Sequence, residues 1–158
     1  MLSDSKLKNY ASGVKIETLT DSIIQKNAVS LTSLLAFNSN LYFKENGFGM
    51  VSSPSFRGTN ASQTAVIWNG ININSQLNGQ TDFNTINTSN YDAITIRSGG
   101  GSVQYGSGAI GGSIHLNNKA SFSKEQKTKL KLQYGSFSTL EGNFKTLFST
   151  KNSFYSVG

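Results

Sequence analysis

The chain has 158 residues, a net charge of +6, no cysteine and a charged fraction of only 14%. This length suits one domain, or one domain and a fragment, while the missing cysteines exclude disulfides and the polar composition argues against a helical bundle. The two arginines, Arg57 and Arg97, are far apart in the sequence, which argues against a nucleic-acid groove.

The N-terminal third predicts two strands and two short helices. Residues 13–20 form a β-rich run, after which Ser22 and Gln25 have the spacing of a capping box that begins a helix. The spacing of leucines over 31–35 predicts another short helix, and residues 40–46 have the composition of a strand. Two small helices are therefore expected before the main sheet.

The middle of the chain alternates strands with Gly/Asn turns. A run at 64–70 ends in Asn-Gly, the strongest short-range turn signal in the chain, and 71–74 is expected to return from it. A polar loop over 75–85 follows, and residues 92–99 predict another strand.

The stretch YGSGAIGGSIHL contains Gly106, Gly108 and Gly111 in the spacing of a dinucleotide-binding loop. Such a loop opens a helix whose N-terminus holds the pyrophosphate. Residues 112–118 instead alternate like a strand, which favours glycines that permit tight turns and close backbone approach. A nucleotide-dependent enzyme requires a helix after Gly111.

The C-terminal part changes character. Residues 128–135 and 138–148 alternate apolar and polar side chains, and 152–158 begins a third such segment. The pattern is typical of an outer-membrane β-barrel and equally of an antiparallel meander with one wet face, because alternation does not identify the solvent. Three strands cannot close a barrel, so the barrel interpretation makes the chain a fragment.

Two stretches carry a family resemblance: SFRGTNASQTAVIWNGININSQLNGQTDF and YDAITIRSGGGSVQYGSGAIGGSIHL. Together they resemble the plug domain of TonB-dependent outer-membrane receptors. In that family an Arg-Gly element, a strand ending in Asp/Asn-Gly and an Ile-x-Arg-Gly…Gly-Gly element follow in this order. The likeness covers roughly residues 14–118 and looks most like the cobalamin-receptor branch. Residues 127–158 resemble the first barrel strands.

The resemblance implies an α+β fold, in which a small mixed β-sheet plug domain with short helices and Gly-rich loops precedes antiparallel strands of a truncated β-barrel. The expected domains are an N-terminal remnant after the TonB box (1–12), the plug (13–120) and the first, incomplete barrel strands (121–158). The TonB-contacting segment is expected before residue 5, where only MLSD stands. We therefore expect this chain to lack the segment that TonB binds.

The function implied by the resemblance is that of a gate and partial ligand site in a transporter, not an enzyme. The imported ligand is a large metal chelate, namely cobalamin, a ferric siderophore or haem, and no cofactor is expected. The implied partners are the rest of the barrel, TonB of the inner-membrane complex and the extracellular chelate. The barrel is expected in the outer membrane, and the isolated fragment is expected to be soluble. The alternative is a soluble secreted β-rich binding module or adhesin fragment, which predicts closed strand edges, whereas the transporter fragment predicts an unpaired edge after residue 138.

The resemblance also implies roles for individual residues. Arg57 and Arg97 match motif arginines that pair with carboxylates of the barrel wall as a plug–barrel lock, the alternative being exposed surface arginines. Two loops match apices that face the ligand, the alternative being ordinary solvated loops. The expected ligand contacts are Val51, Ser52, Gln76, Leu77, Asn78 and Gln80. The expected structural glycines are Gly58, Gly70, Gly99, Gly106, Gly108, Gly111 and Gly112.

His115 is the only histidine, and the sequence offers no second histidine or cysteine to complete a metal site. Its place on a predicted strand favours a structural role. No combination of nucleophile, base and orienting group is visible, so we expect neither catalytic nor metal-binding residues.

Overall fold

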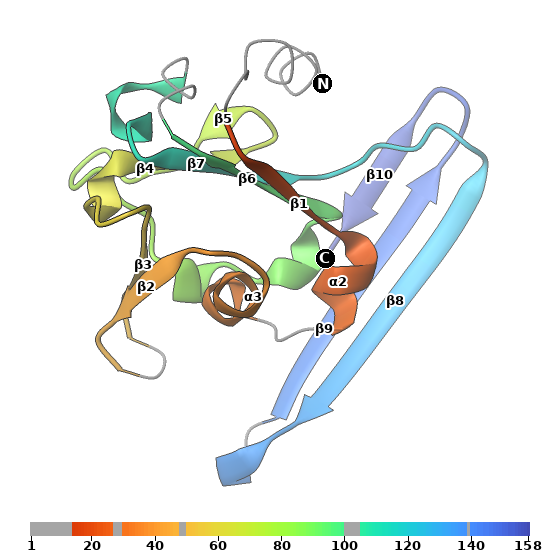
Figure 1. Ribbon diagram of the computed structural model, residues 1–158. Coiled ribbons are helices and arrows are strands. Elements are labelled where there is room, and N and C mark those ends of the chain that lie inside the picture. Colours follow the sequence, from red (N-terminus) through yellow and green to blue (C-terminus); the bar gives the residue numbers. More distant parts are fainter. Residues whose placement is uncertain (1–13, 27–29, 48–49, 100–104, 139) are drawn as a thin grey trace. The chain divides into compact units, whose positions relative to one another are not determined.

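The computed structural model in Figure 1 describes residues 14–26, 30–47, 50–99, 105–138 and 140–158. The chain divides into two compact units, Met1–Asn118 and Lys119–Gly158. The first unit mixes strands and helices, and the second consists of antiparallel strands with one short 3-10 turn in its described part.

A five-stranded mixed sheet in the order β1-β6-β7-β4-β5 is the centre of the first unit. The strands are β1 (Ile16–Thr20), β4 (Thr64–Trp68), β5 (Ile71–Asn72), β6 (Ala93–Ser98) and β7 (Gly112–Asn117). The β4–β7 pair is parallel and the other pairs are antiparallel. The predicted strands are thus present, and β7 begins where a nucleotide-binding loop would begin its helix, which excludes that interpretation.

The helices of this unit are α2 (Asp21–Lys26) and α3 (Leu31–Asn38), and the 3-10 turns are η1 (Ala61–Gln63), η2 (Phe83–Thr85), η3 (Thr88–Asn90) and η5 (Ser107–Ala109). The helices α2 and α3 lie on one face of this sheet (Figure 1), while Ala109 of the turn η5 packs against Ala65 and Ile67 of β4 on the other face. Ser30 caps α3 by accepting a hydrogen bond from the amide of Ser33 at 3.4 Å. The capping box predicted at Ser22 is not formed, since α2 begins one residue earlier and Gln25 donates to the Asp21 carboxylate.

A separate hairpin of β2 (Tyr42–Glu45) and β3 (Ser52–Ser55) lies beside α3. The sequence analysis did not predict β3, because Ser-Ser-Pro-Ser has no β-propensity and Pro54 cannot donate to a ladder. Pro54 is tolerated here because the hairpin is a two-stranded sheet of its own. This hairpin carries the first of the two expected apical loops.

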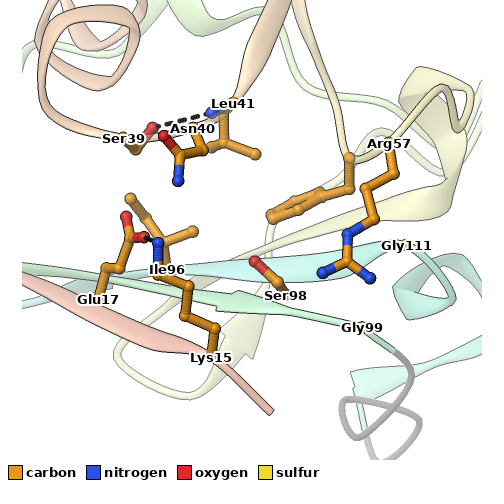
Figure 2. A pocket seen from close by; sticks show the side chains of 11 residues that line it. Lys15, Glu17, Ser39, Asn40, Leu41, Arg57, Ile96, Ser98, Gly99 and Gly111 are labelled. Carbon is orange, nitrogen blue, oxygen red and sulfur yellow. Dashed lines mark hydrogen bonds and ion pairs between the residues drawn. The ribbon is translucent and has the colours of Figure 1, made fainter.

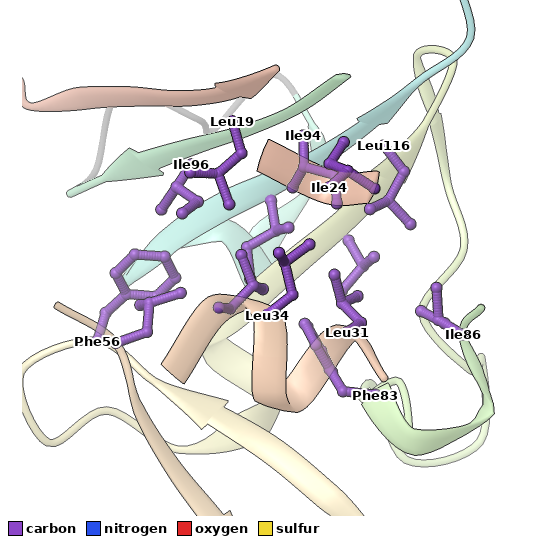
Figure 3. Close-up of a cluster of buried hydrophobic side chains, with 14 residues drawn as sticks. Leu19, Ile24, Leu31, Leu34, Phe56, Phe83, Ile86, Ile94, Ile96 and Leu116 are labelled. Atoms are coloured by element: carbon purple, nitrogen blue, oxygen red, sulfur yellow. The ribbon is translucent and has the colours of Figure 1, made fainter. Parts of the chain in front are cut away.

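The hydrophobic core lies between the sheet and α3 (Figure 3). Leu31 and Leu34 of α3 and Ile94, Ile114 and Leu116 of the sheet are completely buried. Each such side chain contributes about 1.5–3 kcal/mol to folding. The leucine spacing that predicted α3 therefore corresponds to the face that the helix buries.

Close backbone packing at the β6–β7 pair depends on glycine. A Cβ atom at Gly112 would lie 2.5 Å from the Arg97 carbonyl oxygen and 2.9 Å from Cζ of Phe56. Real Cβ atoms do not approach other atoms so closely, so any side chain here separates β6 from β7. The other expected structural glycines either have positive φ (Gly58, Gly70, Gly99 and Gly106) or lie in similarly tight contact (Gly108 and Gly111).

The second unit is an antiparallel sheet of β8 (Glu125–Tyr134), β9 (Leu140–Ser149) and β10 (Phe154–Val157), with the turn η6 (Ser136–Ser138) between the first two strands. Its order is β10-β9-β8, so β8 and β10 each have one neighbour and the sheet is open on both sides. Together with the mixed first unit, this confirms the predicted α+β class with incomplete barrel strands.

The two faces of this open sheet differ in polarity. One face carries eight large apolar side chains, each more than half exposed: Leu130, Leu132, Tyr134, Leu140, Phe144, Phe148, Tyr155 and Val157. The opposite face carries Lys127, Lys129 and Lys131 of β8 and Lys145 of β9. A continuous apolar face left in contact with water is unfavourable, whereas the same face is stable in lipid.

Gly112→Ala tests the close packing of β7. In the full-length protein we expect the substitution to destabilise the sheet by about 1–3 kcal/mol, which lowers hydrogen-exchange protection of the β6 and β7 amides about 5- to 150-fold. Gly142→Ala is the matched control, because its Cβ would meet only Cδ2 of Leu132 at an ordinary 3.5 Å. Unchanged protection in Gly112→Ala would contradict this account of the packing.

Candidate functional site

The two arginines lie at the same end of the main sheet. Arg97 is the last but one residue of β6, and Arg57 follows β3 and lines a cavity of about 230 Å³ together with Ser98 and Gly99. Figure 2 shows the Arg57 side chain extending along this cavity toward Ser98. The fold therefore places two residues that are 40 positions apart in the sequence at the same end of the sheet, although Arg97 does not line the Arg57 cavity.

Arg97 is buried but not neutralised within the described residues. Its residue is 2% exposed, and its Nε and Nη1 atoms have no hydrogen-bond partner. It lies opposite Ser113 in the register, on the face of the sheet that points away from the core, because Ile96 beside it faces the core. Buried donors without an acceptor are unfavourable, so Nε and Nη1 of Arg97 are available to an acceptor outside the described residues.

Arg57 is exposed, and its backbone has a positive φ of 50°. This conformation is uncommon for a residue with a side chain and costs about 1–3 kcal/mol. The only ion pair at the cavity, among the residues described, joins Lys15 to Glu17 (Figure 2). The Arg57 guanidinium therefore faces the cavity without a carboxylate partner in the described part of the chain.

The first expected apical loop is tied down by hydrogen bonds. One carboxylate oxygen of Asp82 accepts the amide of Ser52 at 3.0 Å and the amide of Asn84 at 3.0 Å. The Asn84 side chain in turn donates to the Met50 carbonyl. These bonds hold the tip of the β2–β3 hairpin against η2.

The expected contacts of this loop differ in exposure. Val51 is half exposed at the hairpin tip, whereas Ser52 is completely buried and its hydroxyl accepts a hydrogen bond from Thr32 at 2.9 Å. Ser52 therefore anchors the hairpin from inside instead of presenting its side chain at the surface. Phe48 and Gly49, at the start of this expected apex, lie outside the described residues.

The second expected apical loop, 75–80, is closed by backbone bonds between Ser75 and Gln80 and between Gly79 and Ser75. Leu77 is 95% exposed, and the Asn78 side chain accepts the amide of Gln80 at 3.2 Å. Gln76 is exposed at the same tip. The loop therefore presents one apolar and several amide side chains on a defined backbone.

His115 and Trp68 make contacts with side chains of their own domain. The His115 ring is buried, lies 2.8 Å from the Ser113 hydroxyl and packs edge-on against Tyr105 at 5.0 Å between centroids. The Trp68 ring nitrogen donates to the Asn118 side chain at 2.9 Å.

In the described part of the chain no cluster of acidic, histidine or cysteine residues could hold a metal ion. No helix among the described residues is long and apolar enough to cross a membrane.

Comparison with known proteins agrees with this geometry. The family model of the TonB-dependent receptor plug domain matches residues 8–113. The vitamin B12 transporter BtuB of Vibrio cholerae is 34% identical over 134 residues, covering 84% of this chain and 22% of the transporter. Transferrin-binding protein A of Haemophilus influenzae is 26% identical over 118 residues, covering 67% of this chain and 13% of that protein.

Solved structures show the same fold at low identity. The copper transporter OprC superposes with a TM-score of 0.72 at 17% identity, covering 89% of this chain and 22% of that one. The ferric enterobactin receptor PfeA of Pseudomonas aeruginosa superposes with a TM-score of 0.66 at 19% identity, covering 92% of this chain and 24% of the receptor.

The fold therefore defines the class of protein. It is a mixed-sheet plug followed by the first strands of a barrel. This chain belongs to the TonB-dependent receptor plug domain family. It spans 22% of the length of the Vibrio cholerae transporter and 13% of the length of transferrin-binding protein A. Those relatives are named as a transporter and a binding protein, not as enzymes.

Asp82→Ala tests the anchoring of the first apical loop. Loss of two hydrogen bonds to a charged acceptor is expected to destabilise the hairpin tip by about 1.5–3 kcal/mol, and to raise hydrogen exchange at the Ser52 amide accordingly. Asp82→Asn keeps an acceptor oxygen and is expected to retain most of the protection. Equal exchange in both variants and the native receptor would show that Asp82 does not hold the loop.

Proposed function

We propose that this chain is the plug and the first barrel strands of an outer-membrane transporter that imports a large metal chelate, either cobalamin or an iron chelate such as a ferric siderophore or haem. The observation that carries the proposal is the exposed apolar face of β8–β10 in the segment that follows a plug-family domain along the chain. A sheet with one apolar face and one polar face suits a barrel wall, with lipid outside and a polar lumen inside. The alternative, a soluble secreted module or adhesin fragment, is disfavoured by that face and by the open sheet edges.

The plug acts as the gate of this transporter. Its surface is rich in serine, asparagine and threonine, and a polar surface can be held in a lumen by hydrated contacts that break and re-form. TonB of the inner-membrane complex supplies the force that moves the plug. The segment that TonB would contact is expected just before the plug, and residues 1–13 lie outside the described residues.

Arg57 and Arg97 form the plug–barrel lock in this proposal. Both guanidinium groups lie at one end of the sheet, and each has unused donors in the described part of the chain. A carboxylate from the barrel wall would satisfy the fork of an arginine with two parallel hydrogen bonds and would neutralise the buried charge of Arg97.

The apical loops form the plug's part of the ligand site. Val51, Leu77 and the amides of Gln76, Asn78 and Gln80 offer apolar contact and hydrogen bonding of the kind that a large chelate requires. Ser52 supports this surface from beneath through its bond with Thr32. The relatives at the sequence level favour cobalamin as the first ligand to test.

The lock is tested in the full-length receptor by Arg57→Ala with Arg97→Ala. We expect faster proteolysis of the plug, because truncation of arginine leaves buried carboxylates of the wall unpaired at a cost of about 3–5 kcal/mol. Arg97→Lys keeps the charge without the bidentate fork and is expected to be intermediate. Lys26→Ala, on the exposed face of α2, is the control. A double variant as resistant as the native receptor would refute the lock.

The ligand site is tested by Leu77→Ala with Asn78→Ala in the full-length receptor, titrated with cyanocobalamin and with a ferric siderophore. We expect tight binding of one chelate and a loss of about tenfold or more in affinity in the pair, equivalent to about 1.4 kcal/mol. Phe37→Ala removes a comparably exposed apolar side chain from α3 and is expected to have no effect. Binding of neither chelate would count against the transporter proposal.

A further inference from the structure

The apical loop 75–80 begins where the chain leaves the edge of the main sheet after β5. That strand pairs with β4 over only 2 residues. The next amide along the chain, that of Ile73, still donates to the Val66 carbonyl of β4 at 2.9 Å. In a regular antiparallel pair the Val66 amide would donate back to Ile73. Here it donates to the side chain of Asn74 instead, so the ladder passes from main chain to side chain at this point.

The Asn74 side chain takes the place of a strand beside β4. Its oxygen accepts the Val66 amide at 2.8 Å, and its nitrogen donates to the Thr64 carbonyl at 2.8 Å. These are the next two groups of β4 that a longer β5 would pair. A side-chain amide offers an acceptor and a donor as a peptide group does, so it satisfies this edge while the backbone turns away into the loop.

The second N–H of the same amide reaches the loop. The Asn74 nitrogen also donates to the Gly79 carbonyl at 2.7 Å. The backbone bonds from Ser75 to Gln80 and from Gly79 to Ser75 close the loop on itself. Among the described residues, the bond from Asn74 is therefore the hydrogen bond that joins the closed loop to β4.

The hydrogen-bonding capacity of Asn74 is fully used. An asparagine side chain has two donors and an oxygen with two lone pairs. The donors go to the carbonyls of Thr64 and Gly79, and the oxygen accepts the Val66 amide and, at 3.3 Å, the Thr81 hydroxyl. Aspartate has the oxygen but no donor, and glutamine is longer by one methylene. Asparagine is therefore the residue that fits this position.

We propose that Asn74 is the positioning residue of the ligand site, because it holds loop 75–80 in the orientation in which Leu77 and Asn78 meet the transported chelate. The inference rests on the proposed transport function and deepens it. Leu77 is 95% exposed, so packing of this side chain does not order the loop. A loop that is ordered before the ligand arrives binds it at a lower entropic cost.

The position of Asn74 also couples the ligand to the sheet. One side chain bonds to the loop at Gly79 and to β4 at Val66. A ligand that orders the loop therefore stabilises the bond to the Val66 amide, and coupling between two sites is reciprocal. The Val66 amide, although part of the core strand β4, should report occupancy of the loop.

The test uses the full-length receptor in detergent, with cyanocobalamin and a ferric tricatecholate as probes. Asn74→Ala removes every hydrogen bond of the side chain. Asn74→Asp keeps the oxygen that accepts the Val66 amide but has no proton for the carbonyls of Thr64 and Gly79. Asn152→Ala changes an exposed asparagine in the turn between β9 and β10 and is the matched control.

We expect Asn74→Ala to weaken the probe that binds by about tenfold or more, and Asn74→Asp at least as much, because each loses the bond to Gly79. Without probe, hydrogen exchange of the Val66 amide should rise about tenfold in Asn74→Ala and less in Asn74→Asp, whose carboxylate still accepts it. Addition of the probe should protect this amide in the native receptor but not in Asn74→Ala.

The control should match the native receptor in all three measurements. The Ile94 amide of β6 should keep its native protection in every variant, which shows that the domain is folded.

Three results would overturn the inference and leave the transport function in place. In the first, both Asn74 variants bind the probe as tightly as the native receptor does. In the second, the probe does not change exchange of the Val66 amide in the native receptor, so loop and sheet are not coupled. In the third, Asn74→Ala and Asn74→Asp both lose protection at Ile94, so Asn74 supports the whole fold and not the loop. Binding of neither probe to the native receptor would refute the proposed function and, with it, the inference that rests on it.

Discussion

The close contact between β6 and β7 is the constraint on which the first unit depends. Gly112 permits the β7 backbone to approach the Arg97 carbonyl and the Phe56 ring to distances that no side chain would tolerate. This contact fixes the position of the end of β6. It thereby fixes the buried Arg97 side chain on one face of the sheet and the cavity lined by Arg57 and Ser98 at the same end. The positions of both arginines at this end of the sheet therefore follow from backbone packing and not from proximity in the sequence.

The two units differ in where their apolar side chains lie. In the plug, apolar side chains of α3 and the sheet are buried together and the polar groups remain outside. In the strands of the second unit the large apolar side chains are the exposed ones. In the proposed barrel, lipid on one side of this sheet and a water-filled lumen on the other would give each surface a medium that suits it.

Local patterns predicted most of the elements, because hydrophobic spacing and Asn-Gly turns act over a few residues. The helix over Leu31–Asn38 and the strands around Trp68 and Ile94 follow from such patterns. The sequence did not indicate the β2–β3 hairpin, the parallel β4–β7 pairing or the burial of Ser52, because each depends on partners distant in the chain. Exposure of Leu77 agrees with its expected place at a loop tip, while ligand contact there stays a prediction.

In the proposed transporter this chain gates the energised import of a metal chelate. The most direct measurement is accumulation of labelled cobalamin and of labelled ferric siderophores by cells that carry the full-length receptor, with and without TonB. We expect accumulation of one chelate above background only when both the receptor and TonB are present. Accumulation that is independent of TonB, or no accumulation of any chelate, would contradict it.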